Sequence, residues 1–439
     1  MKIKVTPSKA RRTASLCPVC LERIPARLVQ EGADWYMKKN CPEHGGFKTI
    51  VWRGAPELGS WGSYRPPKEE WEDMPNCPRD CGLCAGHLQS TCCVLIEITS
   101  RCNLRCPVCF AESGDRPPAP EKSPEELYEN FRAMTEAGRK FIQLSGGEPT
   151  VRDDLPQVIA AAKRAGASSI QLNSNGLRLA AEPEFTKKLA EAGLNFVFMQ
   201  FDGVTDGPYE KLRGRPLLRQ KLEAIRVCGE AGLGVTLVPT VVPGVNDHEI
   251  GGIIKLAMEN SPVVRGVHFQ PVSYFGRYPQ PPRDEDRITL PEILRAIEEQ
   301  TGGLIKLSDI APSSCDHPRC GFHGDFVIMP DGITAITPRQ QSSGDCCCSK
   351  SAEPDAEALR NRRFVARRWT RDLAAEQYTG APDDFDGFLA RIKSHGFTIT
   401  GMAFQDAWSI DLERLRRCSL HVYREGRIVP FCANYITEG

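Results

Sequence analysis

Short apolar runs alternate with amphipathic stretches through the middle of the chain. Six runs have the length of β-strands and lie at 94–98, 141–145, 169–173, 196–201, 235–241 and 266–271. Stretches with helical apolar spacing separate them, at 124–137, 155–165, 184–192, 218–231 and 247–260. Strands that alternate with helices in this way form parallel sheets. The pattern therefore predicts an α/β fold in which six parallel strands occupy residues 94–280.

The segments that flank this middle part are richer in cysteine. The chain has 439 residues and 19 cysteines, yet the middle part holds only Cys228 besides the three cysteines of one loop. The predicted units are 1–56, 57–93, 94–280 and 281–439. The first unit has little apolar content, so it needs a metal ion to hold a fold. The second and the fourth collect most of the other cysteines.

Charge and composition exclude several classes of partner. Acidic and basic residues balance at 56 each, so no overall field attracts nucleic acid or an anionic membrane. No window approaches the roughly 20 apolar residues of a membrane span, and the N-terminus shows no secretory signal. The cysteines fall in CxxC and CxxxCxxC clusters, which favours metal ligation in a reducing compartment over disulfides. These features predict a cytoplasmic protein with no nucleic-acid partner and no membrane span.

Three cysteines follow the first apolar run directly. Cys102, Cys106 and Cys109 are spaced so that their thiolates hold three corners of a [4Fe–4S] cluster from one loop. Such a cluster takes four ligands, so one iron stays open for another molecule. A zinc knuckle is the alternative for this spacing. The second apolar run ends in a Ser-Gly-Gly-Glu-Pro turn at 145–149, where glycines let the backbone approach a ligand closely.

The cysteine loop and the Gly-Gly-Glu-Pro turn together resemble those of the radical S-adenosylmethionine (SAM) enzymes. The resemblance implies a partial (β/α)6 TIM-like barrel with its chemistry at the carboxyl ends of the strands. It implies that Cys102, Cys106 and Cys109 ligate the catalytic cluster and that SAM binds at the open iron. The residues that it assigns to SAM are Gly146, Gly147, Glu148, Ser174, Asn175 and Asp202. A plain Asn-Gly turn is the alternative for 175–176.

A second cysteine group precedes the barrel. Cys77, Cys81 and Cys84 repeat the spacing of the first loop, but no strand pattern comes before them. Cys92 completes a set of four, which predicts a fully ligated auxiliary [4Fe–4S] cluster, with structural zinc as the alternative. Adjacent side chains at the start of a strand point to opposite sides, so Cys93 is expected to be a spectator.

Further metal ligands are expected at both ends of the chain. The N-terminal set resembles a zinc-ribbon or rubredoxin-like knuckle, which suits zinc or a single iron ion; it consists of Cys17, Cys20, Cys41 and His44. Candidate ligands of one more cluster in the tail are Cys315, Cys320, Cys418 and Cys432. The consecutive cysteines at 346–348 cannot all ligate one cluster, so at least one is expected to be free, reactive or substrate-facing.

Motifs outside the barrel narrow the resemblance. The segments 41–45, 76–84 and 428–433 are similar to those of the group that includes the tetraether lipid synthases and the class D radical SAM methyltransferases, and of a bacterial radical SAM (seleno)protein subgroup. This likeness implies that SAM is cleaved reductively to a 5′-deoxyadenosyl radical. The radical would functionalise a C–H bond by methyl or methylene transfer or by C–C coupling.

The same likeness implies a small-molecule or lipid substrate and an electron donor such as ferredoxin or flavodoxin. Two other classes stay open on the sequence. One is an iron–sulfur electron-transfer or redox-sensing protein without SAM turnover. The other is a nucleic-acid-modifying enzyme, which the balanced charge disfavours.

Overall fold

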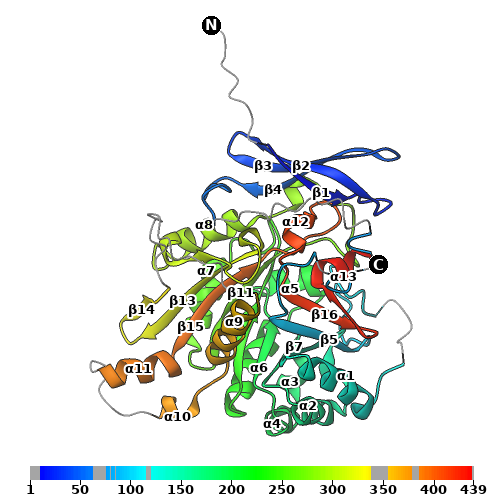
Figure 1. The fold of residues 1–439 in the computed structure, drawn as a ribbon. Coiled ribbons are helices and arrows are strands. Elements are labelled where there is room, and N and C mark those ends of the chain that lie inside the picture. Colours follow the sequence, from blue (N-terminus) through cyan, green and yellow to red (C-terminus); the bar gives the residue numbers. More distant parts are fainter. Residues whose placement is uncertain are drawn as a thin grey trace.

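The computed structural model describes residues 10–62, 76–79, 81–84, 86–114, 120–337, 354–377 and 385–437. An N-terminal antiparallel sheet lies above a larger mixed sheet that helices cover (Figure 1). The small sheet has the order of the chain and consists of β1 (Ala10–Leu16), β2 (Arg23–Glu31), β3 (Asp34–Cys41) and β4 (Gly45–Arg53). Buried and exposed residues alternate along β2 and β3, as expected of a sheet with one solvated face.

The six predicted parallel strands form the centre of the larger sheet, which confirms the α/β barrel-like fold. They pair in chain order and are β5 (Cys93–Thr99), β6 (Phe141–Gly146), β7 (Ser169–Ser174), β8 (Phe196–Gln200), β9 (Gly234–Val238) and β11 (Val264–Pro271). A short strand, β10 (Thr240–Val241), pairs with the end of β11. Most residues of these strands are buried, as is typical of a parallel sheet covered on both faces.

Helices connect the parallel strands and cover their outer face. They are α1 (Pro124–Glu136), α2 (Leu155–Arg164), α3 (Leu177–Ala181), α4 (Pro183–Glu191), α5 (Asp206–Arg213), α6 (Leu218–Glu230) and α7 (Ile250–Glu259). The start of α1 is set by a capping box, in which the Ser123 hydroxyl accepts from the Glu126 N–H and the Glu126 carboxylate accepts in return. The apolar spacing does not predict α5, which is short and largely polar.

Strands from the C-terminal part of the chain extend the central sheet at both edges. The sequence instead predicts that residues 281–439 form a separate unit. At one edge β15 (Gly396–Met402) pairs parallel with β11, and β13 (Gly321–Met329) pairs antiparallel with β15. β12 (Ala311–Pro312) and β14 (Gly332–Ala335) both pair with β13. At the other edge β16 (Leu420–Arg424) pairs parallel with β5, and β17 (Arg427–Pro430) completes a hairpin. An open six-stranded sheet exposes unpaired backbone groups at both edges, and these strands pair with them.

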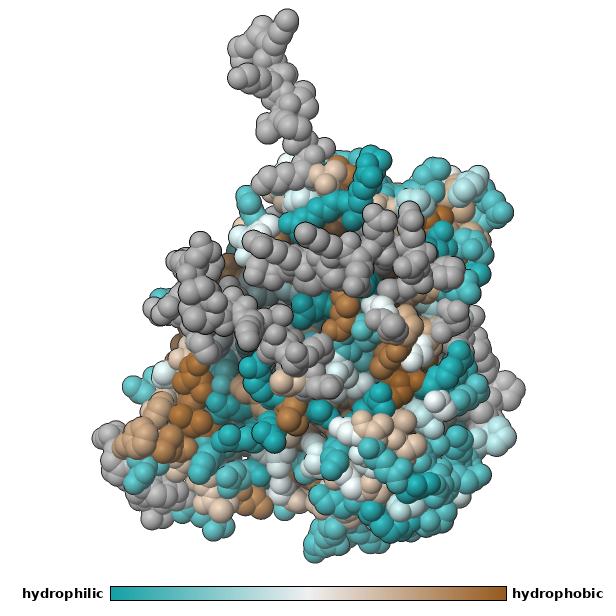
Figure 2. Space-filling model, viewed as in Figure 1, coloured by the Kyte–Doolittle hydropathy of each residue, from teal (hydrophilic) through white to brown (hydrophobic). Residues whose placement is uncertain are grey.

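The remaining helices belong to the C-terminal half: α8 (Leu290–Gln300), α9 (Pro354–Trp369), α10 (Leu373–Glu376), α11 (Phe385–Ser394), α12 (Leu412–Leu415) and α13 (Phe431–Thr437). Figure 2 shows a largely hydrophilic face, with apolar residues gathered around α11, where Phe385 and Leu389 are exposed. Across the described part of the chain, no helix combines the length and apolarity that a bilayer crossing requires.

Candidate active site

A cavity of about 670 Å³ lies at the carboxyl ends of the parallel strands and reaches into the sheet's concave side. Cys102, Cys106 and Cys109 all line it, so the structure brings together the three cysteines that the sequence assigns to the catalytic cluster. Burial raises the pKa of the Cys102 thiol to about 11. A cluster iron bound to this thiol would replace its proton.

Backbone and side-chain contacts fix the cysteine loop in place. Cys109 and Arg277 exchange two backbone N–H···O hydrogen bonds of 2.9 Å each. The Arg277 guanidinium also donates to the Cys106 carbonyl at 2.8 Å. Arg277 lies six residues after β11, so the segments that follow β5 and β11 meet at the cysteine loop. The sequence motifs do not single out Arg277.

The two glycines of the turn allow a close approach of two backbones. The Gly147 N–H donates to the Thr99 carbonyl at 2.9 Å, and the Glu148 N–H donates to the Arg101 carbonyl at 2.8 Å. A Cβ on Gly146 would lie 2.1 Å from the Thr99 oxygen, and one on Gly147 would lie 2.1 Å from the Arg101 oxygen. Only glycine therefore fits between the turn and the residues that lead into the cysteine loop.

Replacing Gly147 with alanine should weaken SAM binding and lower the melting temperature. The added methyl group collides with backbone, which cannot rotate away, and overpacking of this kind costs about 1–3 kcal/mol. Gly207 in α5 provides the matched control, because a Cβ there meets nothing within 4 Å. Thermal denaturation and equilibrium dialysis with SAM would compare both variants. A Gly147→Ala protein that matches Gly207→Ala in both assays would contradict the steric argument.

Glu148 links the turn to the end of the next strand. It is 2% exposed. Its carboxylate accepts from the Ser174 hydroxyl at 2.8 Å, the Asn175 N–H at 2.6 Å and the Thr150 hydroxyl at 2.6 Å. The Asn175 amide donates to the Asn103 side chain at 2.6 Å, which ties this network to the cysteine loop. The predicted residues thus assemble at one rim, with Glu148 holding the others in position.

Asp202 lies behind the cavity wall and Arg213 forms part of it. The Arg213 guanidinium donates to both Asp202 oxygens at 2.7 and 2.9 Å. Asp202 is fully buried and does not line the cavity, whereas Arg213 does. Arg213 also lies close enough to Cys106 for its positive charge to interact with a thiolate there. The resemblance assigns Asp202 to SAM, but of these two residues only Arg213 faces the cavity.

Lys221 is a second buried cation beneath the same rim. Its ammonium donates to the Asn175 carbonyl at 2.6 Å and to the backbone and side-chain oxygens of Gln200 at 2.9 and 2.7 Å. Burial lowers the pKa of Lys221 to about 7. Sequence reasoning misses Lys221. The only signal is a lysine on the apolar side of the stretch 218–231.

The N-terminal set gathers as a compact metal-ligand group. The ligand atoms of Cys17, Cys20, Cys41 and His44 all lie within 4.8 Å of one another. The His44 Nδ1 lies 3.4 Å from the Cys41 Sγ and 3.7 Å from the Cys17 Sγ. Three thiols and one imidazole in this arrangement suit a tetrahedral ion.

The other cysteines are grouped differently from the predicted sets. Cys92 lies in a buried cluster with Cys315, and its Sγ accepts from the Asn361 amide at 3.3 Å. Cys77 and Cys81 instead pack against the apolar cluster that contains Cys432. The spacing of Cys92 from the CxxxCxxC group suggests one set of four, but Cys92, which directly precedes β5, lines the cavity instead.

A third group of thiols lies at the C-terminal side of the sheet. Cys418 is buried within electrostatic range of Cys320 and Cys432. The Arg414 guanidinium donates to the Cys320 sulfur at 3.6 Å, and the Gln405 N–H donates to the Cys432 sulfur at 3.2 Å. Burial raises the pKa of all three thiols, and the Arg414 and Gln405 donors offset part of this rise at Cys320 and Cys432. The predicted tail cysteines are thus split, since Cys315 lies with Cys92. The triplet 346–348 lies outside the described residues.

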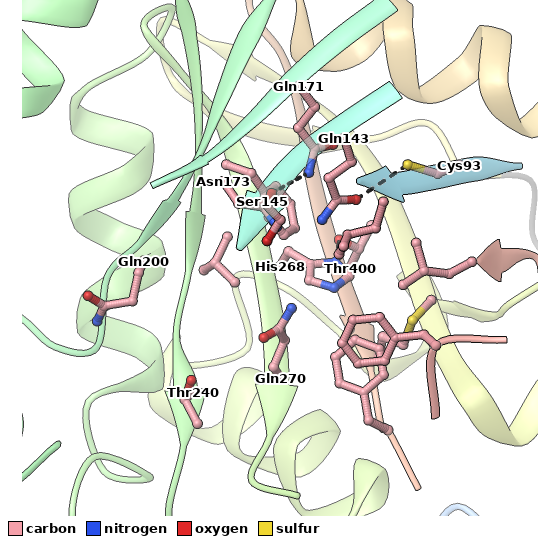
Figure 3. A pocket seen from close by; sticks show the side chains of 18 of the residues that line it. Cys93, Gln143, Ser145, Gln171, Asn173, Gln200, Thr240, His268, Gln270 and Thr400 are labelled. Carbon is pink, nitrogen blue, oxygen red and sulfur yellow. Dashed lines mark hydrogen bonds between the residues drawn. The ribbon is translucent and has the colours of Figure 1, made fainter. Parts of the chain in front are cut away.

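Polar side chains also occupy the inner face of the strands, below the rim. Figure 3 shows Gln143, Asn173 and His268 reaching from different strands toward one space. Sequence reasoning misses Gln143 and Gln171 as cavity residues. The signal for each is a glutamine at an inward position of a strand, with an apolar residue on either side of it.

Comparisons with known proteins agree with this site. Residues 96–257 match the family model of the Radical SAM superfamily, and residues 10–53 match that of the HMPTM N-terminal zinc ribbon domain. The 7,8-dihydro-6-hydroxymethylpterin dimethyltransferase of Methanocaldococcus jannaschii is 35% identical, over 96% of this chain and 92% of its own. The GTP 3′,8-cyclase of Petrotoga mobilis is 29% identical to this chain. The match covers 40% of this chain and 55% of that relative.

Solved structures are more distant. SuiB of Streptococcus suis bound to S-adenosylmethionine is 15% identical, with a TM-score of 0.40 over 48% of this chain and 47% of its own. Methylornithine synthase is 17% identical, with a TM-score of 0.38 over 50% of this chain and 64% of its own.

Proposed function

The chain belongs to the radical SAM superfamily, and on this premise we propose that it is a methyltransferase that acts on a reduced pterin, 7,8-dihydro-6-hydroxymethylpterin or a close analogue. As a member of the superfamily it is an enzyme that cleaves SAM reductively and functionalises a substrate C–H bond. The observation that carries the substrate proposal is the 35% identity to a pterin dimethyltransferase across nearly the full length of both chains.

The residues around the cavity fit the cofactors that this chemistry needs. Three thiols that face one cavity from a fixed loop suit a [4Fe–4S] cluster with one open iron. When bound there, the cluster and SAM supply the electron and the 5′-deoxyadenosyl radical that removes a hydrogen atom from carbon. We assign the chain's own part to three groups: Glu148 holds the rim, Arg213 presents a positive charge to the SAM carboxylate, and Lys221 fixes Gln200. The buried wall limits access of water to reactive species.

For an auxiliary iron–sulfur site we propose Cys320, Cys418 and Cys432 as ligands, with a thiol of Cys77 or Cys81 as the fourth. The mutual proximity of the first three and the packing of the other two on the Cys432 cluster support this set. Buried thiols beside N–H donors and an arginine suit thiolate ligation. Such a cluster would relay electrons from a donor such as ferredoxin or flavodoxin.

For the N-terminal group we propose zinc. Its match to a zinc ribbon model and the closed set of three thiols and one imidazole support a structural ion. Iron–sulfur chemistry and free thiols require a reducing environment, so we place the enzyme in the cytoplasm.

An anaerobic assay tests the proposed substrate. Reconstituted full-length protein would be incubated with SAM, dithionite and 7,8-dihydro-6-hydroxymethylpterin, and the products analysed by mass spectrometry. We expect 5′-deoxyadenosine and methionine from one SAM, together with a pterin heavier by one or two methyl groups. Each methyl group comes either from a further SAM, which then leaves S-adenosylhomocysteine, or from an added folate-type one-carbon donor, in which case no S-adenosylhomocysteine forms. If 5′-deoxyadenosine forms while the pterin stays unmodified with any added one-carbon donor, such as a methylated or methylene-bearing folate-type cofactor, the substrate proposal is wrong.

A further inference from the structure

The interior of this barrel departs from the usual packing of the fold. Barrels of this kind normally fill their interior with layers of branched aliphatic side chains. Here the alternate residues that line the cavity are Phe141, Gln143 and Ser145 of β6 and Gln171 and Asn173 of β7, so four of these five are polar. Their apolar neighbours along the strands belong instead to the main hydrophobic core. Polar groups at positions that normally hold valine or isoleucine indicate a binding surface.

Gln143 presents an N–H donor to the cavity. The Cys93 thiol donates to the Gln143 Oε1 at 3.3 Å, which orients the amide. The Nε2 group then has no hydrogen-bond acceptor among the described residues, although Gln143 is only 8% exposed. A buried amide N–H without a partner costs free energy unless a ligand or water accepts from it.

Gln171 presents the opposite polarity. Its Nε2 donates to the Asn173 Oδ1 at 2.9 Å, and Asn173 in turn donates to the Ser145 hydroxyl at 3.4 Å. The Gln171 Oε1 is therefore left without a donor in the part of the chain that the structure describes, in a residue that is 2% exposed. Gln143 and Gln171 are paired in the β6–β7 register, so the donor and the acceptor lie on adjacent strands about 4.8 Å apart.

An aromatic wall borders this polar edge. The Phe198 ring lies 5.3 Å from the Trp369 ring and 5.1 Å from the His268 ring, measured between centroids. The His268 Nδ1 shares a 2.8 Å hydrogen bond with the Thr400 hydroxyl. Burial lowers the pKa of His268 to about 4, so the wall is uncharged at neutral pH. All three rings line the cavity, where an aromatic side chain can stack on a flat ligand ring.

We propose that this inner pocket binds the uncharged lactam edge of a flat heterocycle, with Gln143 donating to the ring carbonyl and Gln171 accepting from the neighbouring ring N–H. The proposal deepens the proposed function and rests on it, because a reduced pterin carries such an edge. Gln143 precedes Gly146 by three residues, which is about 10 Å along a strand. A bicyclic ring anchored at Gln143 and Gln171 would therefore extend its far edge toward the cysteine loop.

Binding measurements on the reconstituted full-length enzyme test this assignment. The probe is fluorescent 6-hydroxymethylpterin, titrated anaerobically into Gln143→Leu, Gln171→Leu and the control Gln157→Leu, which alters an exposed glutamine of α2. We expect each pocket variant to bind the probe about ten- to a hundredfold more weakly, because one partner of a buried hydrogen bond is lost. Iron content and SAM affinity should match those of the control.

Probe affinity within twofold of the control in both variants would overturn the assignment. If a leucine variant loses iron or SAM binding, Gln143→Asn and Gln171→Asn replace it. They keep the amide but shorten its reach, and the same loss of probe affinity is expected of them.

A second probe separates this inference from the proposed function. Guanine carries the same lactam edge on a different ring. Suppose that the wild type does not bind the pterin but binds guanine, and that Gln143→Leu abolishes guanine binding. The pocket assignment then stands and the pterin proposal fails. If the wild type methylates the pterin and both leucine variants bind and methylate it equally well, the pocket assignment alone fails. If the wild type binds neither the pterin nor guanine, the pocket assignment is overturned as well.

Discussion

Replacing Cys106 with alanine should abolish formation of 5′-deoxyadenosine from SAM. Cys106 is the middle ligand of the loop, its carbonyl is tied to Arg277, and its side chain lies beside Arg213. Without this thiolate, a cluster has only two ligands from the loop, which does not support a stable site-differentiated cubane. The expected result is complete loss of product and loss of one cluster's iron, measured by mass spectrometry and metal analysis.

Cys228 provides the control for this experiment. It is a fully buried cysteine of α6 in an apolar environment, and burial raises the pKa of its thiol, so it stays protonated. Cys228→Ala removes a sulfur without touching the cavity, and iron content and turnover should stay at wild-type levels. Retained 5′-deoxyadenosine formation in Cys106→Ala would refute the assignment of the catalytic cluster.

The second large effect is expected at the buried ion pair. Asp202→Ala leaves the Arg213 guanidinium, 10% exposed, without its bidentate partner. Removing one member of a buried pair typically costs about 3–5 kcal/mol, because the other charge stays uncompensated. The melting temperature should therefore fall clearly. SAM affinity should fall as well, since Arg213 loses its fixed orientation at the cavity wall.

Two further variants separate charge burial from simple loss of an ion pair. Glu223→Ala removes a partner of the exposed Arg226 pair on α6, and such pairs contribute at most about 1 kcal/mol. The double variant Asp202→Ala with Arg213→Met should recover much of the lost stability, because it leaves no buried charge. SAM binding should stay weak in that protein. Equal melting temperatures for Asp202→Ala and Glu223→Ala would contradict the argument.

The sequence predicts those parts of the molecule that depend on local pattern. The six central strands follow from apolar runs of strand length, and the site lies where these runs end. The N-terminal metal group also follows from spacing, because two short turns carry all four ligands. In both cases neighbouring residues in the chain determine the structure.

Contacts between distant segments are not predictable in this way. Pairing of Leu420 with Cys93 and the proximity of Cys92 to Cys315 join segments separated by more than two hundred residues, and no local pattern specifies them. Cysteine density suggests a separate tail unit, whereas strands of the tail join the central sheet at both of its edges. The buried position of Lys221 is not predictable for a similar reason. Its hydrogen-bond partners, Asn175 and Gln200, lie at the ends of β7 and β8, which precede its helix in the chain.

The pairing of β16 with β5 has a consequence for biosynthesis. β5 is the first barrel strand to leave the ribosome, and it carries the cysteine loop at its end. Its outer edge pairs with residues 420–423, which follow β5 by more than three hundred residues in the chain. Most of the chain must therefore be synthesised before the strand that supports the cluster loop is enclosed on both sides. A chain that stops before residue 420 would therefore lack the strand that covers this edge of β5.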